Sequence, residues 1–130
     1  MSEFGKCPFC SRIEEGSGDL FYGTAASFED SFPVSPGHTL VVPRRHEEDF
    51  FNLTDVEQRD LWALVALVRE RLKERLKPNG FNVGFNNGAA AGQTVQHTHV
   101  HIIPRFDGDT ADPRGGIRWV LPQKAKYWND

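Results

Sequence analysis

Apolar residues recur at helical spacing in one long stretch of the chain. From 61 to 76, leucine and valine side chains lie three or four residues apart with charged residues between them, which predicts an amphipathic helix. Thr54 and Glu57 form a capping-box pattern before this stretch, and Pro78 ends it. The pattern predicts one long helix over about residues 54–77, and its alternating charges are typical of a solvated face.

Short apolar runs between glycines, prolines and turn residues surround this helix. Their alternation and their β-branched residues favour strands. The expected strands are "LFYG" and "AASF" within residues 20–28, "HTLVVP" at 38–43, "FNVGFN" at 81–86 and "IRWVLP" at 117–122. We expect "RFDGDTADPRGG" at 105–116 to be a mobile loop, and the strand at 81–86 to form an antiparallel hairpin with the strand that follows it.

That following stretch, "QTVQHTHVHIIPR" at 93–105, alternates three histidines with other residues. Because successive side chains of a strand point to opposite faces, we expect His97, His99 and His101 to share one face, with core residues on the other. Such a row spans more than about 13 Å at about 3.3 Å per residue, so one metal ion cannot easily bind all three. Adjacent imidazoles can instead divide nucleophilic attack at phosphorus and proton donation.

Composition and charge limit the class of protein. With 130 residues, of which 38% are hydrophobic, the chain can bury one core as a single globular domain. A formal net charge of −3 gives no reason to expect bulk nucleic acid as a partner. The longest apolar run, "LWALVALV", is too short for a bilayer, and the N-terminus has no signal-peptide pattern. We therefore expect a cytoplasmic protein with a small-molecule partner and no membrane contact.

The two cysteines, Cys7 and Cys10, form the motif "CPFC". Two thiolates on a tight turn can bind zinc or carry out redox chemistry, or they can be two unrelated core thiols. A redox motif expects a long helix after it, whereas Gly16 and Gly18 break any helix early, so zinc is favoured. Further along, the small residues at 87–93 indicate a loop whose backbone can approach an anion closely.

Together these residues resemble the histidine triad (HIT) superfamily. The motif "HTHVHII", preceded by "AGQTV" and followed by "PR", carries the resemblance, which extends over about residues 7–106; Thr98 is a polar departure from it. The resemblance implies an α+β fold, with an antiparallel sheet of about five strands and one long helix, doubled in a homodimer. The whole chain, 1–130, would be one such domain, with a zinc-bearing N-terminal segment at 1–19 and a C-terminal tail at 107–130.

The resemblance also implies roles for individual residues. His99 matches the nucleophile that attacks the α-phosphate of a nucleotide and becomes a nucleotidyl-histidine, and His101 matches the contact to the phosphate or leaving group. The implied substrate-binding residues are Gln93 and Thr94 at the phosphate, Asp30 at the ribose hydroxyls, Asn86 near both, and His38 beside the histidines.

Zinc-bearing, bacterial-type branches of this superfamily pair a CxxC motif with two histidines. The matching residues here are Cys7, Cys10, His46 and His97, a closed Cys₂His₂ set that would be structural and would remove His97 from catalysis. The alternative is that His46 is a surface residue and the thiols are free. No catalytic metal is required by this scheme, although a divalent ion could accompany a polyphosphate.

The resemblance implies a nucleotide hydrolase or transferase acting at an α-phosphate, with a dinucleoside polyphosphate as the favoured substrate. A phosphoramidase, a dinucleoside polyphosphate phosphorylase and a non-enzymatic, zinc-stabilised nucleotide-binding module remain alternatives, and turnover that depends on His99 separates the enzymes from the module. We expect the tail to shape specificity or the dimer. Its aromatic residues, Trp119, Tyr127 and Trp128, are expected to pack on the body or on a partner subunit rather than on a base.

Overall fold

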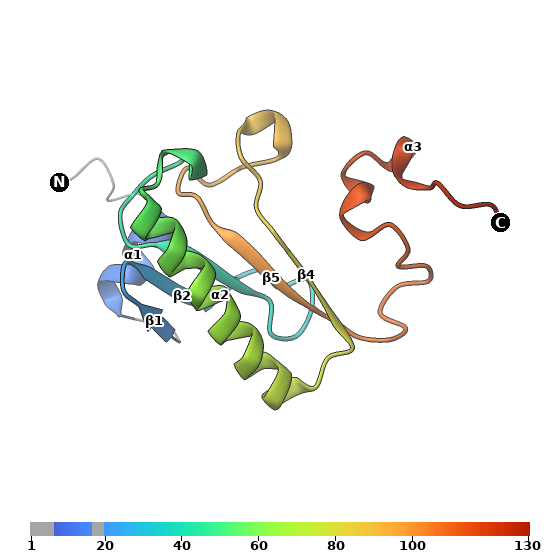
Figure 1. Cartoon of the computed structure of the whole chain (residues 1–130), viewed down its shortest axis with the longest axis horizontal. Helices are drawn as coiled ribbons and strands as arrows, with labels where there is room; N and C mark the ends of the chain where they lie inside the picture. Colours follow the sequence, from blue (N-terminus) through green and yellow to red (C-terminus); the bar gives the residue numbers. More distant parts are fainter. Residues whose placement is uncertain (1–6, 17–19) are drawn as a thin grey trace.

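A single antiparallel sheet of five strands organises the chain in the computed structural model, which describes residues 7–16 and 20–130 (Figure 1). The strand order is β1-β2-β3-β5-β4, and every neighbouring pair is antiparallel. The strands are β1 (Leu20–Tyr22), β2 (Ala25–Glu29), β3 (Thr39–Pro43), β4 (Gly80–Gly84) and β5 (Val100–Arg105). The predicted α+β class and the hairpin-like pairing of β4 with β5 are confirmed.

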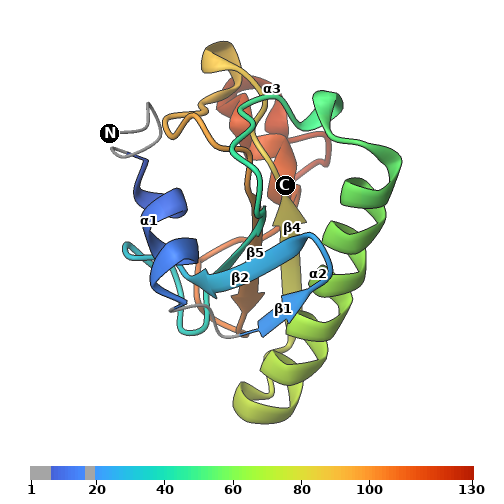
Figure 2. The same cartoon turned by 90° about the vertical axis from the view of Figure 1, so that its left-hand side faces the viewer.

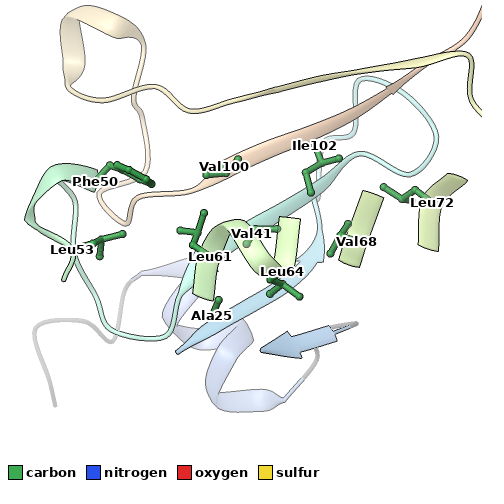
Figure 3. Packing of buried hydrophobic residues seen from close by; sticks show 10 residues of the cluster. All are labelled: Ala25, Val41, Phe50, Leu53, Leu61, Leu64, Val68, Leu72, Val100 and Ile102. Atoms are coloured by element: carbon green, nitrogen blue, oxygen red, sulfur yellow. The ribbon is translucent and has the colours of Figure 1, made fainter. Parts of the chain in front are cut away.

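The long helix α2 (Asp55–Leu76) covers one face of this sheet (Figure 2). It begins at the predicted capping box, in which Thr54 and Glu57 bond reciprocally, and it ends at Lys77 in the left-handed conformation. Its leucines meet sheet residues in the main core, as Figure 3 shows for the ten labelled side chains. The cluster comprises Ala25, Val41, Phe50, Leu53, Leu61, Leu64, Val68, Leu72, Val100 and Ile102.

A short helix, α1 (Pro8–Glu15), packs on the opposite side of the sheet (Figure 2). Its N-cap is Cys7, whose sulfur accepts a hydrogen bond from the Cys10 amide, so "CPFC" lies on the first turn of a helix. Gly16 ends the helix at φ 68°, as its position predicted; Gly18 lies outside the described residues. Phe9 packs with Phe28 in a second hydrophobic cluster. Burial of this apolar ring anchors α1 to the sheet.

The histidine stretch is strand only in its second half. Burial alternates from Val100 to Arg105 as predicted, but β5 begins at Val100 and both His97 and His99 precede it. The three imidazoles still gather on one side as expected, since Phe9 contacts the His97 and His99 rings and the His99 and His101 ring centroids lie 5.0 Å apart. Only the extent of the strand is corrected. The physical reason is that the Thr98 N–H donates to the Glu47 carbonyl at 2.6 Å, and so does not pair with β3.

The tail also differs from its prediction, because residues 117–122 form no strand. They lie in a 3-10 helix, η3 (Gly116–Val120), and in α3 (Pro122–Ala125). Gly115 and Gly116, at φ 92° and 46°, turn the chain sharply there. Two further 3-10 helices, η1 (Phe50–Asn52) and η2 (Ala89–Ala91), lie in loops. Among the described helices, none combines the length and apolar character needed to cross a membrane.

Candidate functional site

The imidazoles lie on the sheet face opposite α2, between α1 and the edge strand β4. Across this face Phe28 pairs with Leu40, Leu40 with His101, and His101 with Gly84. Directly opposed residues of antiparallel strands point to the same face, so these four positions form one row from β2 to β4. The α1 side chain Phe9 closes one end of the row, since its ring centroid lies 5.4 Å from that of Phe28.

His99 is held by a backbone carbonyl. Its Nδ1 lies 2.9 Å from the His97 carbonyl oxygen, and because a carbonyl only accepts, Nδ1 carries the hydrogen. The Nε2 atom of the neutral ring then has a free lone pair. The ring is 8% exposed, packs edge-on against Phe9, and lies 5.0 Å from the His101 ring between centroids. This arrangement presents a nucleophilic nitrogen beside a second imidazole.

His38 determines which nitrogen of His101 carries the hydrogen. The Val34 N–H donates to His38 Nδ1 at 3.1 Å, which places the hydrogen of neutral His38 on Nε2. That nitrogen lies 2.9 Å from His101 Nδ1 and 3.4 Å from an Asp30 carboxylate oxygen. When His38 donates to His101 Nδ1, the hydrogen of neutral His101 is left on Nε2. His101 thereby becomes a hydrogen-bond donor beside the lone pair of His99.

Burial keeps the His38 and His101 rings neutral. It lowers the pKa of His101 to about 4, with smaller contributions from His99 and His38, while Asp30 acts in the opposite direction. Burial likewise lowers the pKa of His38, against the attraction of Asp30. Both rings are therefore uncharged near pH 7, as the chain of hydrogen bonds requires.

A second cluster joins α1 to the start of the histidine stretch. The donor atoms of Cys7, Cys10, His46 and His97 all lie within 4.8 Å of one another. The His46 and His97 Nδ1 atoms lie 3.3 and 3.5 Å from the Cys10 sulfur. Burial, followed by the neighbouring Cys7, raises the pKa of the Cys10 thiol to about 11, a situation that a bound cation would reverse.

The donor chemistry of this cluster fits zinc. His97 Nε2 donates to the Pro43 carbonyl at 2.8 Å, so its Nδ1 lone pair faces the sulfurs, which is the arrangement of a ligand imidazole. Two sulfurs and two imidazole nitrogens are a donor set typical of structural zinc sites. The four residues predicted from the sequence are therefore brought together at a site that can hold a metal.

Asp30, His38 and His101 form another group whose donor atoms lie within 4.8 Å. Here the backbone bond has the opposite effect, because the Val34 N–H occupies His38 Nδ1 and leaves a hydrogen, rather than a lone pair, on Nε2. Two backbone contacts thus distinguish the group that could hold a metal from the group whose central imidazole carries a hydrogen.

The remaining predicted residues border the loop before the histidines. Gln93 donates its two amide hydrogens to the carbonyls of Glu48 and Val95 and accepts from the Gly88 N–H, so it braces this loop. Thr94 is exposed and Asn86 half-buried; neither side chain hydrogen-bonds to another described residue. Their polar groups are free for a ligand, whereas those of Gln93 are already engaged.

Sequence reasoning missed two contributors to this site. Val34 acts through its backbone N–H, which no side-chain pattern can reveal. Phe9, inside "CPFC", contacts His97 and His99 with centroids 5.9 and 5.0 Å away; its apolar character between the two cysteines was the available signal.

Several known proteins share this sequence pattern. An uncharacterized HIT-like protein of Methanocaldococcus jannaschii is 46% identical over 106 residues, covering 79% of this chain and 81% of that protein. The asymmetrical bis(5'-nucleosyl)-tetraphosphatase of Schizosaccharomyces pombe is 38% identical over 106 residues, covering 80% and 58%. The AP-4-A phosphorylase of Mycobacterium tuberculosis is 42% identical over 79 residues, covering 60% and 40%. This chain therefore spans only part of the two relatives named for an activity.

Solved structures share the fold. A hypothetical histidine triad nucleotide-binding protein from Sulfolobus tokodaii has a TM-score of 0.74 at 37% identity, covering 82% of this chain and 73% of that one. A zinc-bound histidine triad family protein from Mycobacterium smegmatis has a TM-score of 0.73 at 30% identity, covering 82% and 80%. The HIT domain model matches residues 20–108. With its imidazole cluster and fold, the chain belongs to the HIT domain family.

Proposed function

We propose that this protein is a nucleotide hydrolase or transferase that cleaves at the α-phosphate of a dinucleoside polyphosphate through a nucleotidyl-His99 intermediate. One observation carries the proposal: the lone pair of His99 Nε2 and the hydrogen of His101 Nε2 follow from two independent backbone bonds, to His97 and from Val34. An acceptor beside a donor is what attack with assisted departure requires.

In the first step His99 Nε2 forms a bond to the α-phosphorus while the bond to the leaving oxygen breaks. His101 keeps its proton and donates a hydrogen bond from Nε2 to that oxygen, which stabilises the charge of the departing phosphate chain, and His38 holds His101 in this orientation by donating to its Nδ1. Water then attacks the phosphorus, His99 departs, and a nucleoside monophosphate is released. If phosphate replaces water, the same site acts as a phosphorylase.

The predicted binding residues have distinct parts in this scheme. Asp30 would accept hydrogen bonds from ribose hydroxyls, and the free hydroxyl of Thr94 would donate to the phosphate, where a fixed donor is worth most as charge develops. Asn86 would add a contact near both groups. Gln93, engaged with backbone groups, would act by positioning Thr94, while any direct phosphate contact would require it to exchange a partner.

The relatives support the substrate class. The names of two of them, a bis(5'-nucleosyl)-tetraphosphatase and an AP-4-A phosphorylase, refer to dinucleoside tetraphosphates, and these proteins share 38% and 42% identity with this chain over 106 and 79 residues. A phosphoramidase would use the same two imidazoles. A nucleotide-binding module without turnover is disfavoured by the free lone pair of His99, which binding alone does not need.

We further propose that Cys7, Cys10, His46 and His97 hold a structural zinc ion. The zinc-bound family member from Mycobacterium smegmatis and the orientation of His97 Nδ1 support this assignment. When bound, zinc would supply cross-linking rather than chemistry, because four protein ligands leave no open position. The homodimer and the cytoplasmic location stay predictions; for the dimer, β4 offers an unpaired sheet edge.

Product analysis tests the activity. Wild-type protein and His99→Ala are each incubated with diadenosine tetraphosphate and with adenosine phosphoramidate, with Gln123→Ala, at an exposed tail position, as control. We expect AMP from the wild type and the control and at least about a thousandfold less from His99→Ala, as for loss of a catalytic nucleophile. If the wild type binds nucleotide but releases AMP from neither substrate, the protein is not a hydrolase of these compounds.

A further inference from the structure

A cavity of about 630 Å³ lies between the C-terminal tail and strands β4 and β5. Ser35, Asn82 and Ile103 line it from the body, and Ile117 and Trp119 line it from the tail. Its volume is within the range of small-molecule sites. The proposed reaction at His99 does not by itself use this cavity.

The cavity begins next to His101. Gly84 pairs with His101 and faces the same side of the sheet, and a Cβ at Gly84 would lie 3.9 Å from Ile117 Cδ1. Ile103 lies two residues beyond His101 on the same strand and face. Val34, whose N–H orients His38, is another lining residue. The tail therefore walls a space that lies next to His101.

The lining suits an uncharged aromatic group. Its one cation among the described residues, Arg105, is neutralised by two hydrogen bonds of 2.8 Å to Asp109 and also donates to Asn82. Asp112 is occupied by Arg114. Trp119 remains 44% exposed, although its indole N–H donates to the Arg114 carbonyl at 2.7 Å. An oriented indole without a free cation favours a nucleobase over a phosphate group.

The position of the cavity relative to Asp30 selects the kind of substrate. Asp30 directly follows β2, whereas the cavity lies at β4, on the other side of β3 and β5. Three strand spacings separate the β2 and β4 backbones, about 14 Å in all, and the Asp30 carboxylate reaches inward from the β2 side to within 4.8 Å of a His101 nitrogen. A molecule that engages both ends must extend past His101 in both directions. Two nucleosides joined by a phosphate chain have this shape, whereas a phosphoramidate ends near His101.

We propose that this cavity binds the nucleoside of the leaving group, with its base against Trp119. The inference rests on the proposed function and specifies which half of a dinucleoside polyphosphate departs. It also gives Trp119 a different role from the packing role that its sequence position suggested. Trp119 is in this view a specificity residue, which acts only when the leaving group carries a base.

Two substrates that differ by one nucleoside test the proposal. Diadenosine tetraphosphate and adenosine 5'-tetraphosphate can both release AMP by attack at the α-phosphate, but only the first has a second base. For Trp119→Ala we expect KM for diadenosine tetraphosphate to rise about tenfold, the typical effect of losing one base–aromatic stack. For adenosine 5'-tetraphosphate, kcat/KM should change less than about twofold, since no stack is lost.

Two further variants control for the tail. Trp119→Phe keeps an aromatic ring and should remain near the wild type with both substrates. Tyr127→Ala removes a tail aromatic that is 72% exposed and does not line the cavity, and it should leave both KM values unchanged. An equal loss with both substrates for Trp119→Ala, or no loss with either, would overturn the proposal.

A binding measurement keeps this test separate from that of the activity. In His99→Ala, diadenosine tetraphosphate should quench tryptophan fluorescence more than adenosine 5'-tetraphosphate does, and Trp119→Phe in the same background should abolish that difference. If the wild type releases no AMP, the proposed activity fails, but this fluorescence difference still decides whether the cavity binds a second nucleoside. Identical quenching by the two nucleotides would exclude it.

Discussion

Single hydrogen bonds to backbone groups orient three of the imidazoles in this protein, those of His38, His97 and His99. The carbonyl of His97 leaves His99 with a lone pair, and the carbonyl of Pro43 turns the lone pair of His97 toward two sulfurs. The N–H of Val34 makes His38 a donor. One neighbouring atom thus decides which nitrogen of a ring carries the hydrogen and which offers a lone pair.

At the scale of single residues, the lowered pKa of His101 predicts a pH effect on stability that a substitution of His101 should remove. Its pKa in the folded protein is about 4, against the usual 6.5, so the folded state binds the proton less readily than the unfolded state. The corresponding stability is fully present above pH 6.5 and is lost as the pH falls toward 4. Between pH 7 and 4.5 the wild type should therefore lose about 1 to 2 kcal/mol more than His101→Gln.

Urea unfolding of both proteins at the two pH values measures this difference. Any loss of metal at low pH affects both proteins, because both retain the four Cys and His residues, and it cancels when the two slopes are compared. Parallel dependence on pH in the two proteins would show that His101 is not held neutral by the fold.

At the scale of elements, the start of α2 is tied to the histidine stretch. Arg45 forms two hydrogen bonds, of 2.9 and 3.0 Å, with the carboxylate of Glu57, and it bonds Glu47 at 3.1 Å. Glu57 completes the capping box with Thr54, while the Glu47 carbonyl receives the Thr98 N–H. The helix N-terminus therefore also fixes the loop that carries His46.

This arrangement predicts the cost of removing the cap. Thr54→Ala should lower the free energy of unfolding by about 1 kcal/mol, because the Glu57 amide loses its partner. Glu74→Ala, an exposed change in the same helix, should alter it by less than about 0.5 kcal/mol. Chemical denaturation monitored by circular dichroism compares the two, and equal effects would contradict a capping role for Thr54.

At the scale of the whole molecule, the Cys and His cluster connects parts of the chain that are distant in sequence. Cys7 and His97 are 90 positions apart, and their donor atoms lie 3.6 Å from each other. A metal at this point would cross-link α1 to the loop after β3 and to the start of the histidine stretch. It would stabilise the fold by binding the folded state alone.

We therefore expect the purified protein to contain one zinc ion per chain. Chelation should lower the unfolding free energy by about 4 kcal/mol or more if the free zinc concentration exceeds the Kd by a thousandfold. Elemental analysis and thermal unfolding with and without chelator measure both effects. Cys10→Ser should lose the metal, whereas His99→Ala should retain it. A wild-type protein that contains no metal, and whose thermal unfolding midpoint is the same with and without chelator, would contradict the assignment.

The sequence by itself determined the elements whose pattern is local. The spacing of Leu61, Leu64 and Val68 placed α2, because an amphipathic helix repeats its apolar face every three or four residues. The alternation from Val100 placed β5, and the motif residues identified the family. The same local reasoning failed at residues 117–122, where "IRWVLP" has strand-like composition but follows two glycines that turn the chain into a 3-10 helix.

Only the tertiary structure decided which atom of each histidine is available. His97, His99 and His101 alternate in the sequence, yet each has a different kind of partner. His97 donates to the Pro43 carbonyl in β3, His99 donates to the nearby His97 carbonyl, and His101 accepts from His38, which the Val34 N–H orients. The resemblance named the four metal-binding candidates, and the fold brought their donor atoms together. It also placed Trp119 in the wall of the cavity beside β4 and β5. Contacts of this kind arise from packing between distant segments, so the order of residues along the chain does not encode them locally.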